Sequence, residues 1–127
     1  QRMDAVVPFI QKHVATRGAA ISEDNPHEGA TYPYPMLITL AGQDEQLVHD
    51  LAKAIHIHYE EYKNADPGSI GWAMERQNFQ WVVPFHEGAV RYFKSIGVWS
   101  NTDDAHNSRL IQRQSVLATA WQLWRTP

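Results

Sequence analysis

Apolar positions recur every three or four residues along much of the chain, which is the pattern of amphipathic helices. This spacing predicts five helices, over about residues 4–17, 44–63, 69–77, 88–96 and 104–124. In each of them, charged and amide side chains occupy the positions between the apolar ones. The chain is therefore expected to be rich in helix.

Two short apolar runs, residues 36–40 and 81–83, lack the helical spacing and are predicted as buried strands. A helical pattern separates them, so they would form a right-handed parallel crossover if both belonged to one sheet. Residues 19–35 are the least regular stretch: a turn is expected over residues 22–26, and a rigid extended connector over residues 32–35, where two tyrosines alternate with two prolines. The predicted fold class is a helix-rich α/β fold with few short strands. Such a thin sheet fits a piece of a larger protein better than a complete small domain.

A sharp turn is predicted where the second apolar run ends. Pro84 ends the run because it has no N–H to give to a strand ladder, and Gly88 lies where the next helix begins. We expect Gly88 to be required for a positive φ angle and His86 to tie the turn by a side-chain hydrogen bond. Asp44 is the expected N-cap of the long second helix, and Gly97 the expected C-terminal stop after the turn's helix.

Composition places the chain among ordinary globular proteins. Its 127 residues are 43% hydrophobic and 20% charged, with a net charge of −3. We treat residues 1–127 as a single region, and the mild negative charge gives no reason to expect a nucleic-acid partner. The absence of cysteine excludes disulfides and thiolate zinc sites. The chain begins at Gln1 without methionine, which suggests processing, cloning or proteolysis.

The histidines are the side chains most able to bind metal or catalyse a reaction. His49, His56 and His58 lie on one predicted helix, but none is one turn from another, as helical zinc ligands are. His86 beside Glu87 resembles a general base, yet no serine or cysteine nucleophile motif accompanies the pair. We therefore favour structural roles and expect no metal, no cofactor and no enzymatic activity.

The stretch Pro84-Phe-His-Glu-Gly-Ala-Val-Arg-Tyr-Phe-Lys-Ser-Ile-Gly-Val-Trp99 closely resembles the C-terminal motif of the TAXI family. These proteins are the solute receptors of tripartite, ATP-independent periplasmic (TRAP) transporters. Thr31-Tyr32-Pro33 and Gln43-Asp44-Glu45 also resemble family segments, although they are further apart here than usual. The resemblance covers about residues 29–99.

The resemblance implies the C-terminal part of a two-lobed periplasmic-binding-protein type II fold, located in the bacterial periplasm. It implies capture of a small solute, with a carboxylate-bearing one expected, for delivery to the transporter's membrane subunits. Tyr32 and Tyr34 would offer hydroxyls to the solute, while Pro84, His86 and Gly88 would form a turn that governs closure of the lobes.

Two other functions stay open. One is a small helical module that binds another protein, and the other, less favoured, is a hydrolase using the histidine and glutamate of the turn. The predicted final helix ends in Trp121 and Trp124, which would rest on the remaining lobe of a receptor. Without that lobe, we expect the chain to associate with itself.

Overall fold

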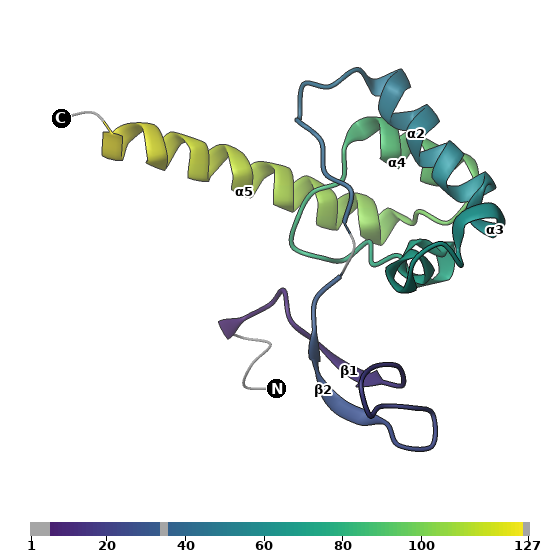
Figure 1. Ribbon diagram of the computed structural model, residues 1–127. Helices are drawn as coiled ribbons and strands as arrows, with labels where there is room; N and C mark the ends of the chain where they lie inside the picture. The colour runs from purple at the N-terminus through teal and green to yellow at the C-terminus, as the bar shows by residue number, and fades with distance from the viewer. Residues whose placement is uncertain (1–5, 34–35, 126–127) are drawn as a thin grey trace. The chain divides into compact units, whose positions relative to one another are not determined.

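A computed structural model describes residues 6–33 and 36–125 of the chain. The chain forms two compact units, Gln1–Tyr34 and Pro35–Pro127. The first contains a β-hairpin and the second contains the long helices (Figure 1). The protein is thus a helix-rich α/β chain with two short strands in its described part, as the predicted fold class requires.

The hairpin of the first unit consists of β1 (Gln11–Ala15) and β2 (His27–Thr31), paired antiparallel with Lys12 opposite Ala30. The loop between them is closed by Ser22 and Asn25, whose backbone groups hydrogen bond to each other in both directions. Turn chemistry predicted this loop correctly.

The helix predicted over residues 4–17 is wrong where β1 forms; residues 4 and 5 lie outside the described part of the chain. Val14, on the predicted apolar stripe, is 53% exposed. A short helix is stable only when its apolar stripe is buried, so the spacing alone did not suffice. Pro8 also lacks the N–H that a continuous helix would use.

The two predicted strands of the second unit are also wrong. Residues 36–40 run as exposed irregular backbone, and residues 81–83 form a bend. An isolated apolar run becomes a strand only when another strand accepts its ladder hydrogen bonds. No strand is found among residues 36–125, so these segments remain irregular.

Two α-helices and two 3-10 helices follow the irregular segment of residues 36–40. Helix α2 (Glu45–Ile57) begins as predicted at Asp44, whose carboxylate accepts a hydrogen bond of 2.8 Å from the backbone N–H of Leu47. A break at His58 separates α2 from α3 (Tyr59–Tyr62). The helix predicted over residues 69–77 is instead a pair of 3-10 helices, η1 (Pro67–Trp72) and η2 (Met74–Arg76).

The core is built around α4 (Glu87–Ser95), which also packs against α2. It is an aromatic cluster in which most rings meet edge to face or tilted, a favourable arrangement for aromatic pairs. The buried members and the half-buried rings against them are Val90, Tyr92, Phe93, Trp99, Phe79 and Phe85. Gly97, with φ +74°, ends α4 as predicted.

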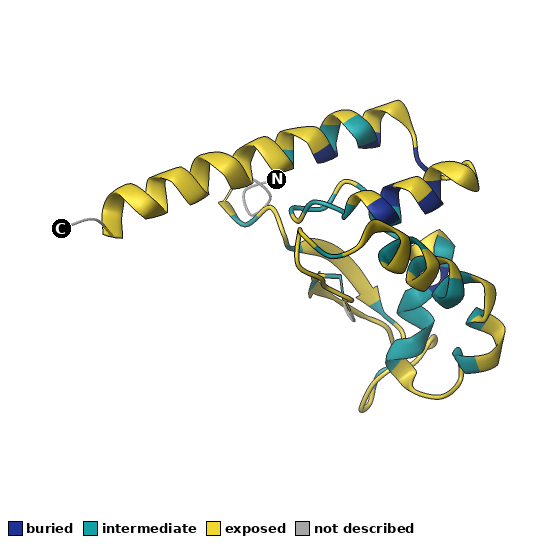
Figure 2. Ribbon diagram, turned by 90° about the horizontal axis from the view of Figure 1, so that it is seen from above, coloured by how far each residue is buried: buried dark blue, intermediate teal, exposed yellow. Residues whose placement is uncertain are grey.

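The last helix, α5 (Asn101–Arg125), begins earlier than predicted. Ser100 and Asp103 cap it reciprocally: Asp103 accepts from the backbone N–H of Ser100 at 2.8 Å, and the Ser100 hydroxyl accepts from the backbone N–H of Asp103 at 3.3 Å. Only the first part of α5 contacts the core. Figure 2 shows its remaining length, residues 111–125, as exposed throughout.

Candidate functional site

The turn from Pro84 to Gly88 is held by two side chains. His86 is the N-cap of α4, and its Nδ1 accepts a hydrogen bond of 3.1 Å from the backbone N–H of Gly88. From α5, the Asn107 amide accepts from the backbone N–H of Phe85 at 2.7 Å and donates to the carbonyl of the same residue at 3.3 Å. The predicted role of His86 in tying the turn is confirmed. The contact from Asn107 was missed, because nothing local in the sequence links residues 22 positions apart.

Gly88 is required for a reason other than the predicted one. Its φ angle is not positive; positive φ occurs at Gly18 and Gly97 among the described glycines. A Cβ atom on Gly88 would lie 2.3 Å from the carbonyl oxygen of Glu45 and 3.0 Å from the backbone nitrogen of His49. Helix α4 therefore approaches the backbone of α2 at this glycine more closely than any other residue would allow.

A second contact joins the same two helices. The hydroxyl of Tyr92 lies 2.7 Å from Nδ1 of His56, and the His49 ring meets the Tyr92 ring edge-on with centroids 5.5 Å apart. Burial raises the pKa of the Tyr92 phenol, so the hydroxyl keeps its proton at neutral pH. Two of the histidines that sequence raised as metal candidates thus contact one tyrosine.

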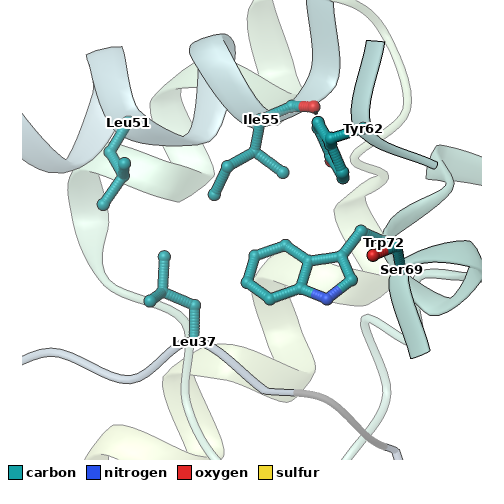
Figure 3. Close-up of a pocket in the computed structure, with 6 residues that line it drawn as sticks. All are labelled: Leu37, Leu51, Ile55, Tyr62, Ser69 and Trp72. Atoms are coloured by element: carbon teal, nitrogen blue, oxygen red, sulfur yellow. Dashed lines mark hydrogen bonds between the residues drawn. The ribbon is translucent and has the colours of Figure 1, made fainter. Parts of the chain in front are cut away.

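An open, apolar pocket of about 360 Å³ lies on the other side of α2, and we call it the Trp72 pocket. In Figure 3 the indole of Trp72 and the side chain of Leu37 form one wall, and residues of α2 and α3 form the other. Its lining residues are Leu37, Leu51, Ile55, Tyr62, Ser69 and Trp72.

The Trp72 pocket offers little polar chemistry. None of its lining residues is charged, so it has no cation to pair with a carboxylate. The Tyr62 hydroxyl already donates to the carbonyl of Ile55 at 2.8 Å, and burial raises its pKa. The pocket is therefore suited to apolar side chains or an apolar ligand. The pocket was not predicted from the sequence, since Leu37 and Trp72 meet only in the folded chain.

Most of the chain is similar to a known protein family. Residues 1–97 match the NMT1-like family, a stretch that covers the hairpin, α2 and the turn with α4. The chain belongs to the NMT1-like family. This family is related to periplasmic binding proteins, so a substrate-binding protein of that general type is indicated. No curated protein and no solved structure matches the chain.

Within this NMT1-like chain, the predicted site residues fall into two groups. Pro84, His86 and Gly88 lie together in the turn that enters α4. Tyr32 belongs to the first unit, directly after β2, and is 53% exposed. Tyr34 lies outside the described residues. A solute contact for either tyrosine, and a hinge role for the turn, stay predictions.

The described residues include neither a cluster of metal ligands nor a membrane-spanning helix. Among residues 6–33 and 36–125, no three His, Asp or Glu side chains are grouped as a metal ion requires. Over the same residues, no helix has both the length and the apolar character to cross a bilayer.

Proposed function

We propose that this NMT1-like protein is the C-terminal part of a TAXI-type solute receptor of a TRAP transporter, working in the bacterial periplasm. It would capture a small solute bearing a carboxylate and deliver it to the membrane subunits of the transporter. The observation that carries the proposal is the family match over residues 1–97, a family related to periplasmic binding proteins. The TAXI-like motif of residues 84–99 supports the narrower assignment.

The contacts of the turn at residues 84–88 are those expected of a hinge in a receptor rather than of a catalytic site. Nδ1 of His86 is engaged by the backbone N–H of Gly88, so its lone pair is not available there to take a substrate proton. Glu87 is exposed in the first turn of α4, where a carboxylate stabilises the positive end of the helix. These contacts support a binding protein with no enzymatic activity.

The solute is expected outside the Trp72 pocket, which lacks a cation. In the proposed receptor it binds between this part and a remaining lobe, where the exposed Tyr32 hydroxyl would reach it. A buried hydrogen bond to a charged group is worth about 1.5–3 kcal/mol, so its loss weakens affinity by roughly 10-fold or more.

The test is calorimetric titration of the full-length gene product with a panel of small organic and amino acids and their uncharged amides. We expect at least one acid to bind, its amide to bind more weakly, and Tyr32→Phe to lose affinity without a change in melting temperature. Tyr59→Phe, a change on the second unit, is the matched control. Absence of binding across the panel would contradict the carboxylate specificity, and an unchanged affinity in Tyr32→Phe would remove Tyr32 from the site.

One observation favours a second function. The exposed second half of α5, which lies beyond the family match, presents tryptophan and leucine side chains to solvent. A helical module that binds another protein would use such a surface. Hydrolysis has no comparable support.

A further inference from the structure

The inner face of α5 continues past the point where the helix leaves the core. Asp103 and Asn107 are buried on this face, and Leu110 is half-buried. The same face continues at spacings of four and three residues through Gln114, Leu117, Trp121 and Trp124. We call the exposed residues 111–125 the tail.

The tail exposes large apolar side chains that a monomer normally buries. Trp121 is 54% exposed and Trp124 is 76% exposed, and the two rings stack on each other with centroids 5.2 Å apart. Exposed apolar patches of this kind mark interaction surfaces. The family match ends at residue 97, so the tail lies outside the matched residues, and its partner is a question separate from solute binding.

Charge indicates which surface the tail fits. After Asp104 the chain carries Arg109, Arg113 and Arg125 and no acidic residue. Two tails packed on each other would bring arginines against arginines, which is unfavourable. The partner of the tail should therefore be both apolar and acidic.

The surface around the Trp72 pocket has both properties. Leu51 and Ile55 of α2 form its apolar wall together with Trp72. Residues 44–66, which contain α2 and α3, carry six acidic residues and two lysines. One of those lysines, Lys63, is already paired with Glu60 at 2.6 Å.

Charged residues also lie toward both ends of the two segments. Arg109 and Arg125 are 16 positions apart in one helix, about 24 Å along its axis. Glu45 lies at the start of α2 and Glu61 lies in α3, on the two sides of the break at His58, and the Glu61 carboxylate is 2.7 Å from Nδ1 of His58. Arg109 lies just before the tail and Arg125 lies at its end. A tail lying along α2, with its tryptophans beside the pocket, would therefore bring both arginines to this acidic segment.

We propose that the tail of α5 docks in the Trp72 pocket of a second copy of this chain, forming a two-fold symmetric dimer. Each copy gives a tail and receives one, so every contact is made twice. A stable interface buries about 1,200–2,000 Å² in total. Each tryptophan buries about 150–250 Å², so four tryptophans contribute a large share of this area.

The first experiment measures the mass of the full chain by sedimentation velocity and light scattering over a range of concentrations. We expect a dimer, and we expect Trp121→Ala with Trp124→Ala to raise the dimer dissociation constant by at least about 30-fold, as central interface tryptophans do. Both tryptophans are exposed, so circular dichroism should show an unchanged fold. Leu123→Ala is the matched control, because Leu123 lies on the tail away from this face. A monomer at concentrations of about 100 µM would overturn the proposal.

The second experiment tests the docking partner by charge reversal. Arg109→Glu with Arg125→Glu should weaken the dimer, and so should Glu45→Lys with Glu61→Lys. All four changes in one chain should restore it, and an equal mixture of the two double variants should form mixed dimers. A dimer indifferent to both double variants, or one not restored by their combination, would overturn docking on α2 and α3.

A crosslink locates the contact. The chain has no cysteine, so Leu37→Cys with Leu117→Cys introduces the only thiols. Oxidation should give a covalent dimer for the double variant and much less for either single variant. Equal crosslinking of all three variants would show that the tail does not reach the pocket. Solute binding by the dimer-disrupting variants separates this inference from the proposed function.

Discussion

Replacing Gly88 with alanine adds one methyl group at the tightest contact between α2 and α4. The new Cβ atom would lie 2.3 Å from the carbonyl oxygen of Glu45. A carbon and an oxygen normally approach to about 3.3 Å, so α4 must move away from α2 by about 1 Å. The oxygen belongs to the backbone of a regular helix, so a side-chain rotation does not relieve the contact.

The expected cost follows from two opposing effects. Overpacking a closely packed contact costs about 1–3 kcal/mol, and a contact of 2.3 Å with helix backbone should lie in the upper part of this range, at about 2–3 kcal/mol. Alanine favours helix over glycine by about 1 kcal/mol, which offsets part of that cost. We expect Gly88→Ala to lower the free energy of unfolding by about 1–2 kcal/mol and the melting temperature by roughly 4–8 °C. Urea unfolding, followed by circular dichroism and tryptophan fluorescence, measures it.

Two other glycines provide matched controls. At Gly42 an added Cβ meets nothing within 4 Å, so Gly42→Ala should change stability by less than about 0.5 kcal/mol. At Gly97 the space is also open but φ is +74°, so Gly97→Ala should cost about 1 kcal/mol through backbone strain alone. Gly88→Ala should also show non-additivity with Tyr92→Phe, since both perturb the contact between α2 and α4. A variant Gly88→Ala as stable as the parent, or more stable, would refute the close-approach argument.

Three further predictions concern the side-chain hydrogen bonds of His86, Tyr92 and Asp103. His86→Ala removes the cap of α4 and should cost about 0.5–2 kcal/mol in urea unfolding, whereas His86→Asn, which keeps a capping oxygen, should recover most of it; equal losses in both would contradict the capping role. Tyr92→Phe removes the hydrogen bond to His56 but keeps the ring, so a loss of about 1 kcal/mol is expected, and no loss would show that the bond is not stabilising. At Asp103, burial raises the carboxyl pKa but hydrogen bonds from Ser100 and Gln80 lower it more, so that the pKa falls below its usual 3.8. Its stabilising effect is then present above pH 3.8 and lost as the pH falls through the lower folded pKa, so Asp103→Asn should destabilise the fold at neutral pH and flatten the acid side of the stability curve.

The helices α2, α4 and α5 of the second unit could be predicted in outline, because their signals are local. A carboxylate at Asp44, three residues before the N–H that it binds, caps α2 wherever the rest of the chain lies. The side chain of His86 reaches the backbone of Gly88 for the same reason. Gly97 ends α4 because glycine alone adopts φ +74° without strain.

The strands could not be predicted, because a strand depends on its partner. The residues of β1 carry an apolar spacing that also fits a helix, and only pairing with β2, more than ten residues away, decides between the two. Residues 36–40 show the opposite case: they have the composition of a buried strand, but none of the described strands pairs with them. Local composition does not report which backbone groups will find partners.

Sequence by itself determined the helical class of the chain, the capped start of α2 and the motif at residues 84–99, because each depends on neighbours within a few positions. Only the tertiary structure decided why Gly88 is glycine, since the close approach of α4 to the carbonyl of Glu45 joins segments some forty residues apart. It also decided that Leu37 and Trp72 share a pocket and that the tail of α5 is left exposed. Periodicity shows that a face is apolar, but the surface that covers it depends on contacts between segments distant in the chain, or between chains.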